Sequence, residues 1–268
     1  MVNKKIEELI KESVSKLISN TTTNTKINKI IDKQKVKTHF VPIRYRIFGG
    51  LLQSLNIQFG NFIEVLLQEI ILEEKQLTII DDISGKKNVI LYLSKETDSL
   101  IDAFITDRQN NSDGKLLIKF DELLKSIISF QQSDKDLITI KHDVDVLFKD
   151  RLGTYYYVEL KYNDDHDTGK FVDINRKFLK TYAGLIKKLE IKTTEQLKPI
   201  LYYLNRKIMK GNIYIPEESH IYRGEKLFNE FLTIKYEDVD NYLKNVSEAE
   251  DIVEIFDKLY KKIRYDEK

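Results

Sequence analysis

The chain has 268 residues, of which 41% are apolar and 32% are charged, so it can bury a sizeable core and is not expected to be globally disordered. Lysine and arginine total 44 against 43 aspartates and glutamates, and this balance leaves no overall positive field that would attract nucleic acid. The absence of cysteine excludes disulfides, thiolate zinc sites and cysteine nucleophiles, and it suits a reducing cytoplasm.

The first 75 residues are predicted to be mainly helical. Apolar residues at helical spacing predict an amphipathic helix over 4–18, and a short helix is expected over 26–36. A segment centred on Gly49 and Gly50 precedes a strongly apolar helix over 57–74. Charge fills the start of the chain, and Glu64 and Glu69 interrupt the longest apolar run, so neither a secretory signal nor a membrane span is expected. We therefore expect a soluble, cytoplasmic protein.

Strands enter the pattern after residue 75. Residues 88–93 are predicted to form a strand, 95–108 fit a helix or a strand, and 115–130 are expected to begin as a strand and end as a helix. Two segments, 137–148 and 154–162, alternate apolar and polar residues on either side of the turn sequence KDRLG. They predict an antiparallel hairpin whose apolar side chains face inward and whose polar side chains face outward.

The last third of the chain returns to helices. Residues 171–189 have helical periodicity, and 199–204 are the next predicted strand, so a crossover unit is expected beside the hairpin. From residue 226 onward, amphipathic helices close the chain. The order of elements predicts an α/β or α+β fold.

A Glu-x-Lys triplet occurs three times, at residues 73–75, 159–161 and 190–192. The first lies at the end of a predicted helix, where residues i and i+2 point apart, and the third follows a helix. Glu159 and Lys161 differ because a strand puts both on one face, and the hairpin brings Asp143 and Asp145 to the same side. Three carboxylates and one ammonium are therefore predicted to converge.

Closely packed carboxylates are unfavourable unless a cation neutralises them, and hard oxygen ligands with room for water suit Mg²⁺, with Mn²⁺ as a substitute. A lysine beside such a site could hold or activate a water for phosphodiester hydrolysis. The alternative is a solvated hairpin face with one cross-strand ion pair, worth about 0.2–1 kcal/mol. That alternative accounts for Glu159 and Lys161, but not for two aspartates two residues apart on the neighbouring strand.

The stretch HDVDVLFKDRLGTYYYVELKY resembles the Asp-x(n)-Glu-x-Lys signature of the PD-(D/E)XK nuclease superfamily. GGLLQSLNIQFGNFIEVL resembles the small-residue turn and acid-bearing helix near the start of many such enzymes, and the whole chain is most similar to the TdeIII-type restriction enzymes. The resemblance implies Asp145, Glu159 and Lys161 as catalytic residues, with Asp145, Glu159, Asp143 and Glu64 as metal-binding acids. Whether Asp143 or Asp145 is the principal ligand stays open, although Asp145 is favoured because it is nearer the turn.

The resemblance also implies a fold. We expect a PD-(D/E)XK nuclease-like core with a central mixed β-sheet flanked by helices, and added N- and C-terminal helices. The chain is expected to be a single elaborated nuclease domain, with an N-terminal helical part over 1–75, a catalytic sheet core over 76–215 and a C-terminal helical part over 216–268.

Polar and basic side chains directly after Lys161 are candidates for contacts with DNA phosphates and base edges. The alternative is a polar loop and helix start, with Asp165 or Asp167 as a cap. The candidate DNA-binding residues are Asn163, His166, Thr168, Lys170, Asn175, Arg176 and Lys177.

The expected function is that of a type II restriction endonuclease, which hydrolyses phosphodiester bonds in double-stranded DNA at a short, palindromic sequence. The resemblance hints at a GC-rich interrupted palindrome. Symmetry of the site implies a homodimer, and restriction implies a DNA methyltransferase as functional partner. The alternatives are a structure-specific or repair nuclease with the same active site, and a non-catalytic DNA-binding or scaffold protein.

Overall fold

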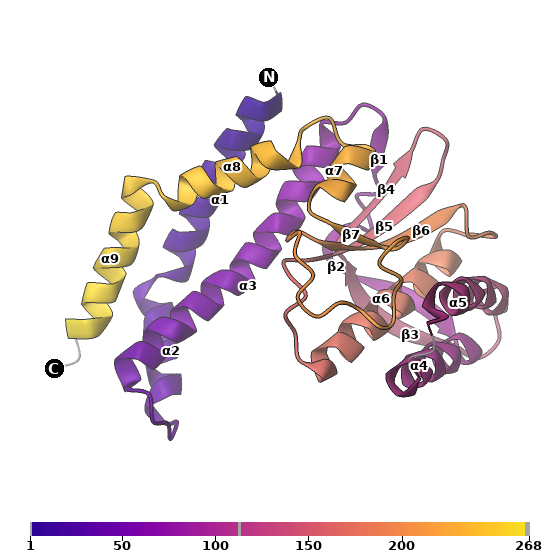
Figure 1. Ribbon diagram of the computed structural model, residues 1–268, viewed down its shortest axis with the longest axis horizontal. Coiled ribbons are helices and arrows are strands. Elements are labelled where there is room, and N and C mark those ends of the chain that lie inside the picture. The colour runs from indigo at the N-terminus through magenta and orange to yellow at the C-terminus, as the bar shows by residue number, and fades with distance from the viewer. Residues whose placement is uncertain (1, 112–113, 266–268) are drawn as a thin grey trace. The chain divides into compact units, whose positions relative to one another are not determined.

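The computed structural model describes residues 2–111 and 114–265, which form two compact units (Figure 1). One unit comprises Met1–Ile70 and Ile234–Lys268, and the other comprises Ile71–Thr233. The first is the helical unit and the second is the sheet unit. The expected division of one domain into parts 1–75, 76–215 and 216–268 stays a prediction.

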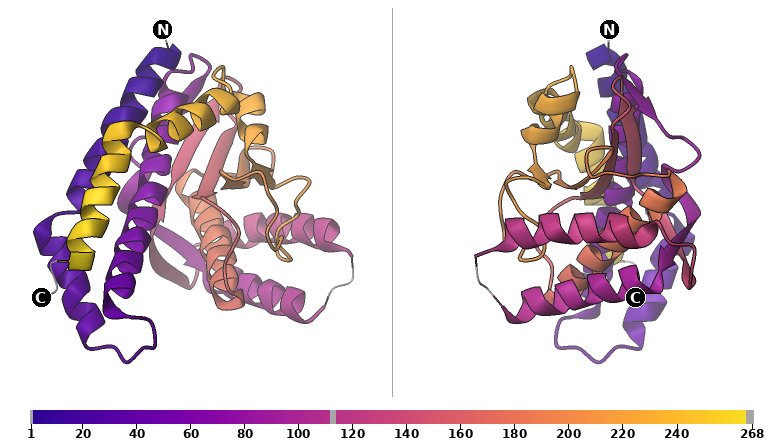
Figure 2. Two further views of the ribbon diagram at one scale, coloured as in Figure 1. Left: turned by 60° about the vertical axis from the view of Figure 1, so that its left-hand side comes forward. Right: turned by 90° about the vertical axis from the view of Figure 1, so that its right-hand side faces the viewer.

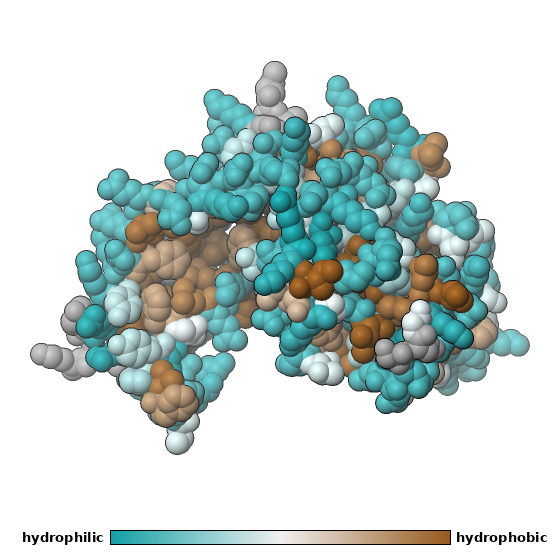
Figure 3. Space-filling model, viewed as in Figure 1, coloured by the Kyte–Doolittle hydropathy of each residue, from teal (hydrophilic) through white to brown (hydrophobic). Residues whose placement is uncertain are grey.

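The helical unit is built from amphipathic helices. Its members are α1 (Val2–Thr21), α2 (Asn24–Lys35), most of α3 (Ile43–Leu72), α8 (Tyr236–Ser247) and α9 (Glu250–Tyr265). The core of this unit draws on four helices and is formed by Ile18, Ile27, Ile47, Leu51, Leu55, Ile252, Leu259 and Ile263. On the face shown in Figure 3, apolar atoms remain visible between α3 and α9.

The expectation of a turn at Gly49 and Gly50 is wrong, because both lie inside the continuous helix α3. A side chain at Gly50 would place its Cβ 3.0 Å from Cγ2 of Ile30 on α2. The glycine therefore serves a close approach of two helices. By length and composition α3 could cross a membrane, but core helices of soluble proteins pass the same test, and Ile47 and Leu51 are buried in the helical unit.

The sheet unit contains a five-stranded mixed sheet in the order β1-β4-β5-β6-β7 (Figures 1 and 2). Its strands are β1 (Leu77–Ile79), β4 (Val146–Asp150), β5 (Tyr155–Lys161), β6 (Leu197–Tyr203) and β7 (Ile221–Arg223). The pairs β1–β4 and β4–β5 are antiparallel, whereas β5–β6 and β6–β7 are parallel. The predicted turn and the crossover through α6 (Thr168–Lys188) are confirmed, whereas β1 and β7 were not predicted.

A second sheet pairs β2 (Gly85–Ser94) with β3 (Leu137–Val144) in antiparallel fashion. The helices α4 (Lys95–Asn110), α5 (Leu116–Gln131) and α6 pack against one another and against β2. Ser94 caps α4 by accepting a hydrogen bond from the Thr97 amide, which resolves the open choice at 95–108 as helix. The expectation of a strand at the start of 115–130 is wrong, because α5 is helical throughout. The short helix α7 (Glu225–Phe231) also belongs to the sheet unit.

The expected single strand over 137–148 is divided at a bend at Asp145. Its first part, β3, pairs with β2, and its second part, β4, pairs with β5 in the other sheet. The Ser84 hydroxyl is bonded to both the amide and the carbonyl of Leu147, at 2.9 and 3.0 Å, just beyond the bend. The expected fold class is confirmed: a central mixed sheet is flanked by helices.

Candidate active site

The strand β5 lies inside the sheet, between β4 and β6, and its residues from Tyr156 to Leu160 are all buried. Register pairs Val146 with Val158, so the next residues outward, Asp145 and Glu159, are neighbours on adjacent strands. Asp145 is 4% exposed and Glu159 is 0% exposed. This burial contradicts the alternative of a solvated hairpin face.

Two lysines neutralise this pair of buried carboxylates. The Lys161 ammonium lies 2.8 Å from Glu159 Oε1 and 3.6 Å from Asp145 Oδ2. The Lys177 ammonium, which comes from α6, lies 2.8 Å from the same Glu159 oxygen and 3.7 Å from Asp145 Oδ1. The Tyr157 hydroxyl donates to Glu159 Oε2 at 2.8 Å. We call Asp145, Glu159, Lys161 and Lys177 the charge cluster.

The two carboxyl groups of the charge cluster differ in their electrostatics. Burial alone would raise the pKa of Glu159, but Lys161 and Lys177 outweigh it and hold this pKa below its usual range. Burial and the neighbouring Glu159 charge raise the pKa of Asp145, although the Leu160 amide donates to Asp145 Oδ2 at 2.8 Å. Burial would lower the pKa of Lys177, but the two carboxylates raise it. Glu159 is thus the stronger anion of the pair.

The charge cluster does not include the other two predicted metal-binding acids, Asp143 and Glu64. Asp143 is half-buried on β3 and accepts a hydrogen bond from the Asn88 amide at 2.8 Å. Glu64 lies on α3 in the helical unit. Across residues 2–111 and 114–265, no three His, Cys, Asp or Glu side chains gather closely enough to hold a metal ion. The structure therefore brings together two of the predicted carboxylates, with one lysine that was predicted as catalytic and one that was not.

Lys177 had been predicted as a DNA contact, and sequence reasoning missed its place in the charge cluster. A signal was present, because Lys177 follows Ile174 by three residues and precedes Phe178, both of which are buried. Phe178 stacks on the Tyr157 ring at 5.4 Å between centroids. A charged residue on the apolar face of an amphipathic helix is expected to meet an opposite charge in the interior.

The remaining DNA-binding candidates divide by exposure. Thr168 and Lys170 are exposed at the start of α6, where Asp167 is the N-cap, while Asn163 and His166 are partly exposed in the loop before it. Arg176 is partly exposed and pairs with Asp102 at 2.8 Å. Asn175 is fully buried, and its amide donates to the Phe171 carbonyl at 2.8 Å. In this conformation Asn175 has no surface that DNA could touch.

A buried aspartate anchors the loops beside the charge cluster. Asp164 is 0% exposed and pairs with Arg223 at 3.0 Å. It also accepts from the Met209 amide at 2.8 Å, while the Leu204 amide donates to the Lys161 carbonyl at 2.9 Å. The loop after β5 and the loop after β6 are thus tied together at the carboxyl ends of two parallel strands, where α/β proteins commonly bind ligands.

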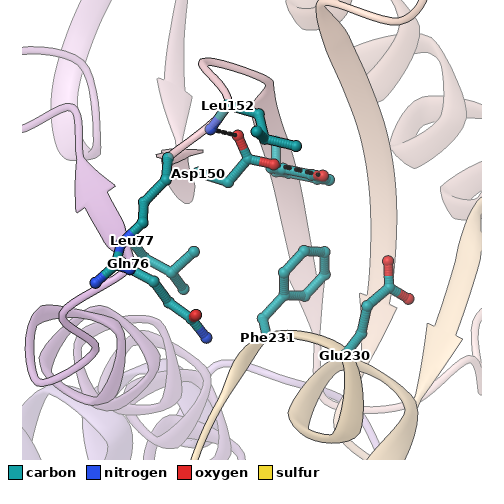
Figure 4. Close-up of a pocket in the computed structure, with 8 residues that line it drawn as sticks. Gln76, Leu77, Asp150, Leu152, Glu230 and Phe231 are labelled. Atoms are coloured by element: carbon teal, nitrogen blue, oxygen red, sulfur yellow. Dashed lines mark hydrogen bonds between the residues drawn. The ribbon is translucent and has the colours of Figure 1, made fainter.

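A cavity of about 320 Å³ lies at the opposite end of β5 (Figure 4). Asp150 and Leu152 line it from the β4–β5 turn, Gln76 and Leu77 from the start of β1, and Phe231 from α7. Tyr156, at the start of β5, also lines it, whereas Lys161 ends that strand. The charge cluster is therefore separate from this cavity.

Comparison with known proteins decides the family. The family described as "Type II restriction endonuclease, HinfI" matches residues 2–247. The type II restriction enzyme HinfI of Haemophilus influenzae is 49% identical to this chain over 263 residues, which cover 98% of each protein. The chain belongs to the HinfI family of type II restriction endonucleases. No solved structure matches.

Membership of the HinfI family confirms the predicted recognition of a type II restriction endonuclease, a site-specific deoxyribonuclease whose substrate is DNA. The family that matches is that of HinfI, whereas the whole chain was expected to be most similar to the TdeIII-type enzymes. Type II restriction endonucleases generally need a divalent metal, and they act as soluble proteins.

The donor atoms of the charge cluster suit such a metal. Asp145 and Glu159 offer carboxylate oxygens, and the Leu160 carbonyl oxygen lies 2.8 Å from the Lys161 ammonium. Divalent Mg²⁺ is commonly held by one or two carboxylates together with waters and substrate phosphates, so a third acid is not needed. Each of these three groups lies within 3.7 Å of a lysine ammonium, so their oxygens face positive charge.

Proposed function

We propose that this protein is a Mg²⁺-dependent type II restriction endonuclease that hydrolyses phosphodiester bonds of double-stranded DNA at a short palindromic sequence, with Mn²⁺ able to replace Mg²⁺. The observation that carries the proposal is the buried pair Asp145 and Glu159 with the Lys161 ammonium 2.8 Å from Glu159. Bound there, the divalent cation would neutralise phosphate charge and lower the pKa of the attacking water.

In this proposal, Asp145 and Glu159 hold the cation and Lys161 orients the attacking water. The Lys161 side chain is 23% exposed, whereas those of Asp145 and Glu159 are buried, so Lys161 is the member of this trio that can meet substrate and solvent. The Leu160 amide fixes Asp145, and Tyr157 fixes Glu159, which keeps both carboxylates in place before substrate arrives. Asp143 and Glu64 remain proposed accessory acids that would act through water.

DNA is proposed to cross the loop before α6 and the first turn of that helix. The exposed or partly exposed candidates there are Asn163, His166, Thr168 and Lys170, with Arg176 further along α6. Backbone amides at a helix N-terminus and basic side chains both suit phosphate oxygens. Each subunit holds one charge cluster and would cut one strand, so a palindromic site is proposed to be cut by a homodimer. A methyltransferase with the same specificity would protect host DNA in the cytoplasm.

The test is digestion of plasmid DNA by the purified protein with and without Mg²⁺. Discrete fragments that form only with the metal are expected, and Lys161→Ala should bind DNA with near wild-type affinity but lose at least about a thousandfold in cleavage rate, because the water would lose its orienting charge. An unchanged fragment pattern from Lys161→Ala would refute the assignment of Lys161.

The same experiment separates the alternatives. A structure-specific or repair nuclease would cut without a fixed sequence, giving a smear in place of discrete fragments. A non-catalytic DNA-binding protein would give no fragments, and its melting temperature would not respond to Mg²⁺. For the proposed enzyme, Mg²⁺ should raise the melting temperature, and Asp145→Asn should abolish that rise.

A further inference from the structure

The charge cluster contains one more ammonium than the proposed hydrolysis uses. Lys177 lies on α6, sixteen residues after Lys161, and contacts both Glu159 oxygens at 2.8 and 3.1 Å. It also lies 3.7 Å from Asp145 Oδ1, so it bridges the two carboxylates. Lys161 and Lys177 approach Glu159 through the same oxygen, Oε1.

Charge counting shows what the second ammonium does. Two carboxylates and two ammonium groups sum to zero, so the metal-free cluster is neutral even though Glu159 is completely buried. A divalent cation added to an unchanged cluster would leave two positive charges in excess in a poorly solvated place, which is strongly unfavourable. Moving one ammonium away when the metal binds would remove half of this excess.

The contacts favour Lys177 as the group that moves. The Lys161 ammonium is held by Glu159 and by the Leu160 carbonyl, both at 2.8 Å and both on its own strand. Lys177 donates to Glu159 from a different element, α6, and its side chain is 33% exposed against 23% for that of Lys161. Outward rotation would place this long, partly exposed side chain in water, while the incoming cation replaces its ammonium beside the two carboxylates.

We infer that Lys177 is a positioning residue that takes the place of the divalent cation in the metal-free enzyme, holds Asp145 and Glu159 ready for it, and is displaced when it binds. This inference rests on the proposed metal-dependent function. The displaced ammonium would remain at the site on the tether of α6, close to where a DNA phosphate must approach. Lys177 thereby links metal binding to the presence of substrate.

The test measures Mn²⁺ binding without DNA, by following the electron paramagnetic resonance signal of the free ion. Lys177→Gln should tighten Mn²⁺ binding by at least about tenfold, because a competing unit charge within about 4 Å of both carboxylates is removed. Lys177→Met, which keeps the alkyl part of the side chain, should tighten Mn²⁺ binding to the same extent. It replaces Lys177→Gln in the test if the glutamine variant does not fold. Lys177→Arg keeps the charge and should stay within about threefold of wild type.

Lys180 supplies the matched control. It lies on the same helix but pairs with Asp98 at 2.5 Å and Asp102 at 3.4 Å, so Lys180→Gln should leave the Mn²⁺ dissociation constant unchanged. The inference is overturned if a folded Lys177→Gln or Lys177→Met variant binds Mn²⁺ no more tightly than wild type. A loss of DNA affinity with unchanged Mn²⁺ affinity would make Lys177 a simple phosphate contact. Plasmid digestion by wild type judges the proposed function separately.

Discussion

Replacing Glu159 by glutamine should destabilise the protein, although residues of active sites often can be neutralised at no cost or with a gain in stability. This active site differs because the two carboxylates of the charge cluster are neutralised by its two ammonium groups. Glu159 accepts from Lys161 and Lys177 at 2.8 Å on one oxygen and from Tyr157 at 2.8 Å on the other. Glutamine keeps the shape but leaves two ammonium groups facing one carboxylate.

The expected loss of unfolding free energy is about 3 kcal/mol. Two bonds between an ammonium and a carboxylate become bonds between an ammonium and an uncharged amide oxygen, at a loss of about 1 kcal/mol each, and the remaining excess positive charge is poorly solvated. Asp145→Asn should cost less than Glu159→Gln, because the bond from the Leu160 amide survives and burial already disfavours the charged form of Asp145. The two lysines lie 3.6 and 3.7 Å from Asp145, beyond good hydrogen-bond distance.

The assay is urea unfolding of wild type and both variants, followed by far-ultraviolet circular dichroism without metal. Because the pKa of Glu159 is lowered on folding, its contribution is complete above its ordinary value of 4.5 and is lost as the pH falls. The gap between wild type and Glu159→Gln should therefore narrow on acidification. The pKa of Asp145 is raised on folding, so its contribution is present at low pH and is lost as the pH rises through the folded value.

Equal stability of Glu159→Gln and wild type near neutral pH would refute this reasoning, because it would mean that the lysines do not neutralise Glu159 in the folded protein. A gap that widens on acidification would contradict the assigned direction of the pKa shift.

Two further predictions concern the support of the site. Gly184→Ala on α6 should lower the free energy of unfolding by about 1–3 kcal/mol, because the new Cβ would lie 2.6 Å from Leu91 Cβ on β2. Gly60→Ala is the control and should not destabilise the protein, because no atom lies within 4 Å of its Cβ. The melting temperatures of the two variants are compared by thermal unfolding. Equal melting temperatures would contradict the close approach of Gly184 to Leu91. Asp164→Asn should cost about 2–4 kcal/mol, expose the loop around Met209 to proteases and weaken DNA binding, because the Arg223 pair is lost. Asp165→Asn, an exposed neighbour, should leave stability and protease resistance unchanged.

Much of the active site could be predicted because local sequence determines it. Glu159 and Lys161 are two residues apart on one strand, and the KDRLG turn fixes which residue of the preceding strand lies beside them. Lys177 could not be assigned in this way. Its place depends on how α6 packs on the sheet, and the sequence alone offers only a charged residue between two apolar ones.

The wrong expectations share a physical cause, since each depends on a distant partner. The alternation over 137–148 does not show that one half pairs with β2 and the other with β5. Gly50 was expected in a turn, whereas the reason for a glycine there is the close approach of Ile30, a tertiary contact that the local sequence does not reveal. The apolar residues at the start of α5 are compatible with a strand by composition. The segment is helical because Phe120 is buried against other helices, which is a tertiary contact.

The bend at Asp145 makes one backbone segment part of two sheets, because β3 before it pairs with β2 and β4 after it pairs with β5. Asp145 therefore lies where the two sheets join, whereas Glu159 lies on β5, which belongs to the mixed sheet only. A small rotation of one sheet against the other would move the Asp145 carboxylate relative to that of Glu159. Any force that turns β2 and β3 against the mixed sheet would therefore change the spacing of the Asp145 and Glu159 carboxylate oxygens.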